Sequence, residues 1–257
     1  MAISIKNKSQ IEYMRESGRI VADTLAVLRH SLRDGITTAQ LDRIAEKYIR
    51  SQGAVPSFKG YRDFPCAICT SVNEEVIHGI PGGRKLRNGD IISLDVGAFK
   101  NGYHGDAART FPVGTLAPET DLLLKRTREG FFQSIRFAKN GRHLFEISAA
   151  IEDYVTPFGY SIVKEFVGHG VGRDMHEDPV IPHFRQKSRG PKLCAGMTLA
   201  IEPMVNLGAA KVHILRDKWT VVTDDKSLSC HYENTVLITD GEPELLTASE
   251  DNEYDCV

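Results

Sequence analysis

The chain of 257 residues has no apolar run near the ~20 residues that span a bilayer, and its first residues lack the apolar stretch of a signal peptide. It also lacks an excess of either charge, because 32 Lys and Arg balance 34 Asp and Glu for a formal net charge of −2. These absences exclude a membrane span and a polybasic clamp for nucleic acid. We therefore expect no membrane partner and no DNA partner.

Cysteine is scarce as well, and the five present are an odd set in a chain too large to need disulfide staples. We therefore expect a reducing compartment and a cytoplasmic location. Cys66 and Cys69 form a lone C-x-x-C pair, and without a second pair this is a poor zinc site. The five are Cys66, Cys69, Cys194, Cys230 and Cys256.

Hydrophobic residues (41%) and charged residues (26%) are present in the proportions of a globular protein with a real core. Apolar residues at helical spacing predict helices over 11–28 and 38–48, and a further helical region follows residue 113. Strand-like runs separated by turn residues make up much of the rest. The mixture predicts an α+β fold with antiparallel sheet. The predicted strands are 66–71, 90–99, 103–113, 160–167, 197–205, 219–223 and 232–239.

An internal repeat is indicated by a register shift of 106 residues, which aligns the second helical pattern with a later one without a gap. Apolar positions follow the same register, and a chance match is the alternative. The shift predicts two similar halves, about 1–115 and 116–257, that share one core within a single domain, 1–257. It matches Gly35 with Gly141, Leu41 with Ile147, Ala45 with Ile151, Glu46 with Glu152, Tyr48 with Tyr154, Ile49 with Val155 and Gly53 with Gly159.

Two acids flank a predicted hairpin whose turn is Asn101-Gly102. The spacing places Asp95 and Asp106 opposite each other to within a residue or two, on a face of small residues, where like charges repel. A bound cation would relieve the repulsion, and two solvated carboxylates near a turn are the alternative.

Two more acids interrupt apolar strand patterns, Glu202 in the run 197–205 and Glu233 in the run 231–238. A lone acid in a core strand needs a partner. His169 lies between Gly168 and Gly170, which allow backbone or a ligand to approach closely. The four carboxylates carry four negative charges, which two divalent cations would cancel, and oxygen ligands of this kind favour Mn, Fe or Co.

These five residues, in this order and these strand contexts, resemble the metal ligands of the pita-bread metallopeptidases. The run from Phe166 to Pro179 (FVGHGVGRDMHEDP) resembles the signature of type I methionine aminopeptidases, and NEEVIHGIP, 73–81, resembles a second motif of that family. The likeness covers nearly the whole chain. Prolidases and Xaa-Pro aminopeptidases usually carry an extra N-terminal domain. The type II methionine aminopeptidases carry a helical insertion between the ligand His and the first ligand Glu. In this chain His169 and Glu202 are only 33 residues apart, so the resemblance is to type I.

The resemblance implies a pita-bread fold with two pseudo-symmetric halves around a curved antiparallel sheet and helices on the outer face. It implies a metallo-exopeptidase that removes the initiator methionine from the N-terminal peptide of nascent proteins, favours a small second residue and uses two divalent ions (Co, Mn, Fe or Zn). Asp106 and Glu233 would bridge the ions, Asp95 would complete one shell, and His169 with Glu202 the other.

Further roles are implied by the same resemblance. Glu202 would also carry protons, which makes it catalytic, and His78 and His176 would contact the scissile peptide. The carbonyls of Asn73, Glu75 and Ser229 would hold a monovalent cation. The methionine pocket would be lined by Phe58, Tyr61, Phe64, Cys69, Met175 and Trp219, together with His78 and His176.

The chain departs from the family at four of these positions or beside them. Similar enzymes often have Cys in place of Phe58, Tyr in place of Phe64 and Phe in place of Met175, so the shape of the pocket is less firmly implied than the metal site. His231 stands where Gln is usual.

Three rival functions are open: an Xaa-Pro peptidase of the same fold, a non-catalytic pita-bread binding module, and a nucleotide-dependent enzyme that uses the glycines around His169. The basic stretch 185–192 is either an exposed loop or a contact with ribosomal RNA. We expect a monomer, with the acidic tail 250–257 frayed.

Overall fold

The computed structural model describes residues 2–248. Met1, Cys256 and the acidic tail 250–257 lie outside the described residues. Four helices and many short strands make up this part of the chain, and none of its helices is long and apolar enough to cross a membrane. The helices are α1 (Lys8–Ser31), α2 (Thr38–Ser51), α3 (Pro118–Ile135) and α4 (Leu144–Val155), with 3-10 turns at Tyr61–Asp63 and Thr156–Phe158.

The strands form four antiparallel sheets. The first contains β1 (Val55–Pro56), β2 (Ile68–Val72), β4 (Ile91–Lys100) and β5 (Tyr103–Pro112), and β4 pairs with the other three. The second runs in the order β13 (Ser229–His231), β10 (Met204–Asn206), β6 (Ser161–Ile162). The third is β11 (Val212–Ile214), β12 (Val221–Thr223), β3 (Glu75–Ile77). The fourth is β15 (Glu244–Leu245), β14 (Asn234–Leu237), β9 (Thr198–Ile201), β7 (Gly168–Gly170), β8 (Glu177–Ile181).

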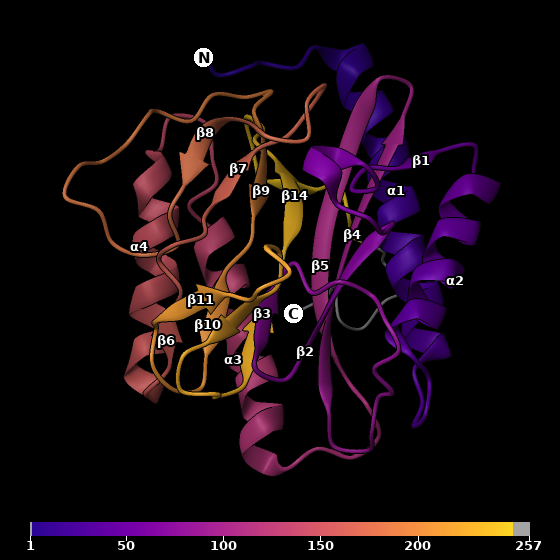
Figure 1. Cartoon of the computed structure of the whole chain (residues 1–257). Coiled ribbons are helices and arrows are strands. Elements are labelled where there is room, and N and C mark those ends of the chain that lie inside the picture. Colours follow the sequence, from indigo (N-terminus) through magenta and orange to yellow (C-terminus); the bar gives the residue numbers. More distant parts are fainter. Residues whose placement is uncertain (1, 249–257) are drawn as a thin grey trace.

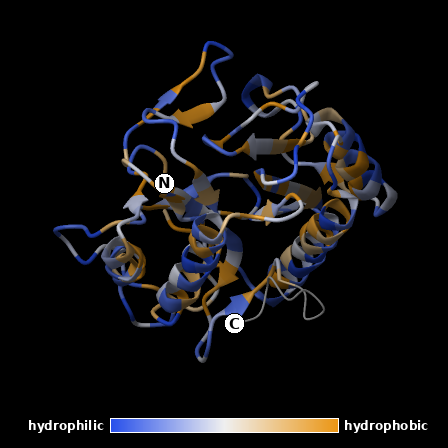
Figure 2. Ribbon diagram, turned by 90° about the horizontal axis from the view of Figure 1, so that it is seen from below, coloured by the Kyte–Doolittle hydropathy of each residue, from blue (hydrophilic) through white to orange (hydrophobic). Residues whose placement is uncertain are grey.

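Two pairs of helices enclose the strands from opposite sides (Figure 1). Helix α1 packs on the hairpin β4–β5, α2 packs on α1, β1 and β2, and α3 and α4 cover the later strands. Each helix turns an apolar stripe toward the strands and its hydrophilic side outward (Figure 2). Capping boxes begin α1 at Asn7 and α2 at Thr37. The pita-bread α+β fold expected from the sequence is confirmed. Its two largest buried apolar clusters lie apart, one under α1 and α2 and one under α3 and α4, so the single shared core that the sequence predicted is divided.

The predicted hairpin is present with its turn at Asn101-Gly102. Asp95 pairs with Ala108, and Asp106 pairs with Gly97. Because residues two apart on a strand share a face, Asp95 and Asp106 are diagonal neighbours on the same face.

Several strands differ from the prediction. The expected strand 160–167 is reduced to β6, and the expected strand 197–205 is broken into β9 and β10 at Glu202-Pro203. Proline has no N–H to donate to a neighbouring strand, so the ladder stops there. The strand expected from Trp219 begins only at Val221. The strands β1, β3, β7, β8, β11, β13 and β15 were not predicted as separate elements, because they are two to five residues long and too short to show a period.

The segments that lead into α2 and α4, which the register shift of 106 aligns, have the same backbone features. Gly35 and Gly141 both have positive φ, and their N–H groups bond to the carbonyls of Leu86 and Leu193. The residues before α2 and α4 each form an isolated bridge, Thr37 with Lys85 and His143 with Lys192. These matches support the division into two related halves, which stays a prediction.

Candidate active site

One cavity of about 310 Å³ brings together every residue that the sequence singled out for the metals, the peptide and the methionine side chain. The hairpin β4–β5 supplies Asp95 and Asp106, β7 supplies His169, and the chain just after β9 and β13 supplies Glu202 and Glu233. Residues separated by up to 138 positions in the chain therefore meet in one place. Five further lining residues were not predicted: Arg62, Ile77, Glu165, Phe166 and Val167.

Hydrogen bonds between the halves hold the acids in place. The Thr235 hydroxyl accepts from the Asp106 N–H at 3.1 Å and donates to the Asp106 carbonyl at 2.9 Å. The Glu233 N–H donates to the carbonyl of Ala108 at 2.9 Å. The backbone of β5 is thus tied to the chain around β14, which fixes Asp106 and Glu233 next to each other.

The ligating atoms lie close enough to share ions. His169 Nε2 is 3.7 Å from Asp106 Oδ2 and 3.6 Å from Glu202 Oε1. Asp106, His169 and Glu233 form one group of potential ligand atoms that lie within 4.8 Å of one another, and Glu202, His231 and Glu233 form a second. Two groups that share one carboxylate are suited to a pair of neighbouring ions.

Buried charge without a counter-ion is the main electrostatic feature of the site. Asp95 Oδ1, Asp106 Oδ1 and Glu233 Oε1 are buried and accept no hydrogen bond from residues 2–248. Burial raises the pKa of the Asp95 carboxyl to about 7 and holds the pKa of Glu202 well above its usual range. Burial and the neighbouring acids do the same to the pKa of Asp106 and Glu233. Cations would take the place of these protons, so the residues fit a divalent metal centre.

The geometry of His169 suits the role of a metal ligand. Its Nδ1 bonds to the carbonyl of Gly170 at 2.8 Å, which leaves the Nε2 lone pair facing the acids, and burial lowers the pKa of the imidazole to about 3. A Cβ added to Gly168 would lie 2.3 Å from the carbonyl oxygen of Ala200, and one added to Gly170 would lie 2.2 Å from that of Asp178. The glycines therefore let β7 approach its neighbours, and they do not form a phosphate-binding loop at a helix.

The two other predicted histidines border the cavity beside the ligands. The His176 ring lies 4.1 Å from the His169 ring, and its Nδ1 is 2.9 Å from the Tyr61 hydroxyl. His78 has φ 58°, a left-handed conformation that is uncommon outside glycine and is often found at functional sites. Its ring meets Phe166 and Trp219 edge-on, so both imidazoles are aimed into the cavity by aromatic contacts.

The residues expected to hold a methionine side chain form one apolar cluster. Phe58, Phe64, Cys69 and Met175 are buried together, with Tyr61 and Trp219 packed against them. The small-residue face next to Asp95 is not all free space, because a Cβ at Gly97 would lie 2.8 Å from the Phe58 ring. The ring of Phe58 thus rests on Gly97 and forms part of the wall.

Sequence analysis missed three buried polar residues around the acids. Arg109, 1% exposed, donates to the Glu233 carbonyl and, at 2.8 Å, to Asn234 Oδ1. His183 Nε2 accepts from the Glu202 N–H at 3.1 Å, which fixes the backbone at the break between β9 and β10. His231 was noted only as a departure from the family. Charged or imidazole side chains inside apolar runs were the signal that could have identified all three.

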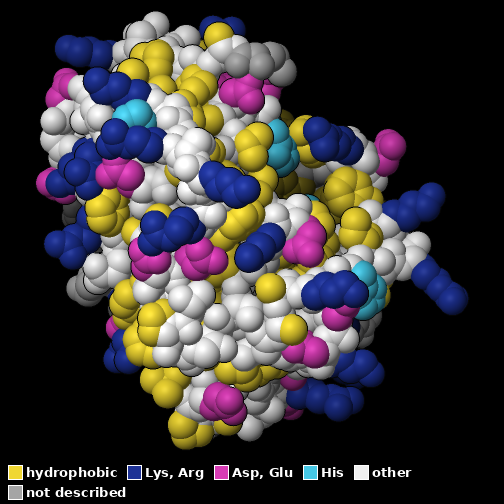
Figure 3. All heavy atoms as spheres, turned by 90° about the vertical axis from the view of Figure 1, so that its left-hand side faces the viewer, with side chains coloured by type: hydrophobic (Ala, Val, Ile, Leu, Met, Phe, Trp, Pro, Cys, Tyr) yellow, Lys and Arg dark blue, Asp and Glu magenta, His cyan; other side chains and the backbone are white. Residues whose placement is uncertain are grey.

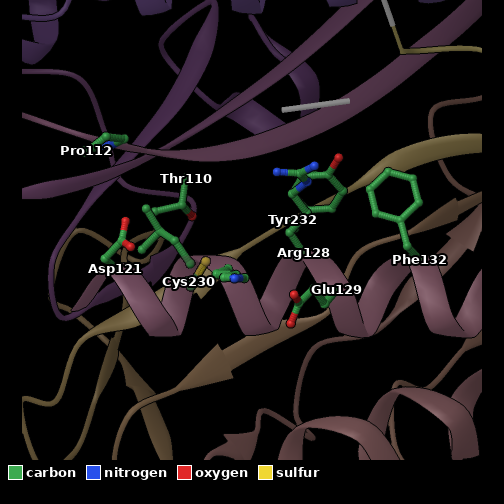
Figure 4. A pocket seen from close by; sticks show the side chains of 10 residues that line it. Thr110, Pro112, Asp121, Arg128, Glu129, Phe132, Cys230 and Tyr232 are labelled. Carbon is green, nitrogen blue, oxygen red and sulfur yellow. The ribbon is translucent and has the colours of Figure 1, made fainter. Parts of the chain in front are cut away.

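A larger cavity of about 450 Å³ lies elsewhere, between α3 and the strands (Figure 4). Cys230 and Tyr232 face it together with Thr110 of β5 and Arg128 and Phe132 of α3. Neighbouring residues in an extended chain point to opposite sides. His231 and Glu233 therefore project away from this cavity, toward the acids.

Comparison with known proteins agrees with this geometry. The model of metallopeptidase family M24 matches residues 12–240. The chain belongs to this family. A methionine aminopeptidase of Clostridium acetobutylicum is 54% identical over 249 residues, which are 96% of this chain and 100% of that one. The crystal structure of methionine aminopeptidase from Thermotoga maritima is 41% identical and superposes with a TM-score of 0.94 over 96% of this chain and 100% of that one.

Prolidases share the fold at a greater distance. The prolidase of Pyrococcus furiosus is 23% identical, with a TM-score of 0.78, and the match covers 96% of this chain and 66% of that one. The match leaves about a third of the prolidase uncovered. Within the M24 family, the chain therefore resembles the methionine aminopeptidases in sequence and the prolidases in fold alone.

Proposed function

We propose that this M24 peptidase removes the N-terminal methionine from nascent proteins. The observation that carries the proposal is the placement of four acids and His169 at one end of a cavity whose other wall is the apolar cluster around Phe58 and Met175. An unbranched, polarizable methionine side chain suits such a pocket. A small second residue suits a cavity of about 310 Å³.

The site residues divide the work of hydrolysis. Two divalent ions would be held by Asp95, Asp106, His169, Glu202 and Glu233, and when bound they would lower the pKa of water and offer a site for the free amine of the substrate. The carboxylate of Glu202 takes the proton of the attacking water and returns it to the leaving amine. His78 and His176 donate to the carbonyl oxygen as negative charge develops on it. Desolvation lowers the pKa of the His78 imidazole to about 4, which keeps this donor neutral.

Peptide hydrolysis tests the proposal directly. Metal-stripped protein is given Met-Ala-Ser or Ala-Pro-Ala, with Mn, Co, Fe or Zn added back in turn. Metal-dependent release of Met alone is the expected result, and it also ranks the metals. Cleavage of Ala-Pro-Ala in its place would favour an Xaa-Pro peptidase, and no cleavage with any metal would favour a binding module.

The His78→Ala variant separates substrate contact from metal binding. We expect kcat to fall by about 10²-fold, the cost of losing one donor to the developing oxyanion. Bound metal, measured by elemental analysis, should not change, because His78 is not among the potential ligand groups of residues 2–248. His30→Ala, an exposed histidine on α1, is the matched control. A loss of metal from His78→Ala would contradict its assignment to the substrate.

A monovalent cation near Asn73, Glu75 and Ser229 stays part of the proposal. The Ser229 N–H donates to the Asn73 carbonyl at 2.9 Å, which brings the two segments together. Asn73 also has φ 58°, which turns its carbonyl out of a regular strand. A cytoplasmic location and a monomeric state are likewise proposed from the sequence.

The basic stretch 185–192 is partly neutralised by α4. Arg185 Nη2 is 2.5 Å from Asp153 Oδ2, and Arg189 Nη2 is 3.9 Å from Glu146 Oε1. On the face that Figure 3 shows, Lys and Arg side chains are interspersed with Asp and Glu. Ribosome contact through this stretch thus depends on Lys187 and Lys192 more than the sequence suggested.

Ribosome binding is tested by neutralising all four charges of the stretch. We expect co-sedimentation with ribosomes at low salt to fall several-fold, since contacts with phosphate are electrostatic. A control variant with four exposed charges neutralised on α1 and α2 should sediment as the unmodified protein does, and equal sedimentation of both variants would reject the contact. The test variant changes Arg185, Lys187, Arg189 and Lys192, and the control changes Lys8, Arg19, Arg43 and Lys47.

A further inference from the structure

His231 lies at the metal centre without a role in the ligand set carried over from the family. Its side chain is 1% exposed, and neither ring nitrogen has a hydrogen-bond partner within residues 2–248. A buried polar group left without a partner destabilises the folded chain. An imidazole in this position therefore needs something to bind.

The distances from His231 to the neighbouring acids indicate that the partner is a metal ion. His231 Nε2 lies 3.7 Å from Glu202 Oε2 and 4.0 Å from Glu233 Oε2. Metal bonds to nitrogen and oxygen are about 2.0–2.2 Å long, so two ligand atoms of one ion lie at most about 4.4 Å apart. Both separations are within this limit, and both exceed the length of a hydrogen bond.

The carboxylate of Glu202 lies between two imidazoles. Its Oε1 faces His169 at 3.6 Å and its Oε2 faces His231 at 3.7 Å. The two groups of potential ligands each contain one histidine, and the acid they share is Glu233. One imidazole therefore lies on each side of the Glu202 carboxylate.

Hydrogen bonds to a neighbouring strand fix the backbone of His231. The Thr110 hydroxyl accepts from the His231 N–H and donates to the His231 carbonyl, each at 2.9 Å, and it also contacts Ser93 Oγ at 2.7 Å. Cys230 and Tyr232 point the opposite way, toward α3 (Figure 4). The imidazole is therefore fixed toward the acids by its strand and by β5.

We propose that His231 Nε2 is a sixth protein ligand of the metal centre, binding an ion together with Glu202 and Glu233. The inference rests on the proposed dinuclear centre and adds a second nitrogen donor to it. Imidazole suits Fe, Zn and Ni, whereas carboxylate and water suit Mn. A second imidazole ligand would make the centre favour Fe, Zn or Ni over Mn more strongly than a centre with Gln at this position does.

The test counts imidazole ligands by NMR. Protein labelled with 15N in its histidine rings is stripped of metal and titrated with two equivalents of Zn²⁺, and the ring nitrogens are assigned with His169→Gln and His231→Gln. We expect the Nε2 resonances of both His169 and His231 to move to metal-bound positions. A spectrum of the unmodified protein with both ions bound, in which the His169 resonance responds and the assigned His231 resonance does not, would overturn the proposal.

Metal affinity provides a second readout. His231→Gln should weaken one Zn²⁺ site by about tenfold or more, with a smaller change for Mn²⁺ because a nitrogen donor has been lost. Equal losses for the two metals, or no loss, would contradict direct ligation. If Asp106→Asn also leaves Zn²⁺ binding unchanged, the metal centre itself has been misplaced, whereas a response to Asp106→Asn alone refutes only the role of His231.

Discussion

Replacement of Glu202 by Gln is expected to lower kcat for Met-Ala-Ser by about 10²–10⁴-fold, the contribution typical of a positioned general acid–base group. The half-buried carboxylate lies between His169 and His231, at 3.6 Å and 3.7 Å, where a proton acceptor can face the attacking water. Gln keeps the shape and one oxygen, so the fold should be preserved. Steady-state kinetics at saturating metal measure the change.

A matched control distinguishes this effect from a general loss of charge. Glu119→Gln removes an exposed carboxylate from the first turn of α3, which does not line the cavity. The kcat of this variant should stay within about twofold of the value for the unmodified protein. If Glu202→Gln binds two equivalents of metal and keeps kcat within tenfold of the unmodified protein, Glu202 does not carry the proton.

Removal of one acid should have opposite effects on the metal-free and the metal-loaded protein. At pH 8, metal-free Asp95→Asn is expected to unfold at a temperature about 4–8 °C higher than the unmodified chain, corresponding to roughly 2 kcal/mol. Asp95 lies among three other acids and its Oδ1 is buried without a partner in the described chain, so an ionised carboxylate there opposes folding. With metal in excess the order should reverse, because the variant has lost a ligand and binds the ions less tightly.

The pH dependence follows from the direction of the shift. Burial raises the pKa of Asp95 from 3.8 to about 7 in the folded chain. Below about pH 4 the carboxyl is protonated in both states, and above about pH 7 it is ionised in both. The advantage of metal-free Asp95→Asn should therefore grow from pH 4 to pH 7 and then stay constant.

Thermal unfolding in the presence of a chelator, followed at several pH values, measures the difference. Asp63→Asn, at an exposed position with φ 70° that Asn tolerates, is the control, and its unfolding temperature at pH 8 should stay close to that of the unmodified chain. A metal-free Asp95→Asn that unfolds at or below the temperature of the unmodified chain at pH 8 would show that the acids do not repel one another.

Much of the fold was determined by local sequence pattern. Helices α1 and α2 have long apolar periods and capping residues, and the hairpin β4–β5 has alternation and an Asn-Gly turn, so both were predicted with nearly the right limits. The short strands β7 and β13 carry no period, because three residues are too few to show one. Their pairing depends on backbone contacts such as that of Gly168 with Ala200.

The ligand set stays a prediction of the sequence. Glu202 and Glu233 stood out because a lone acid in an apolar strand must find a partner, Asp106 stood out because of its place in the hairpin, and the resemblance to the pita-bread metallopeptidases implied their role as ligands. The sequence did not show which of these side chains contact one another. Only the tertiary structure placed Glu202 between two imidazoles, set Phe58 on Gly97 and brought His231 within 4.0 Å of Glu233. Such contacts join segments far apart in the chain, so they follow from the packing of the two halves and not from any local pattern.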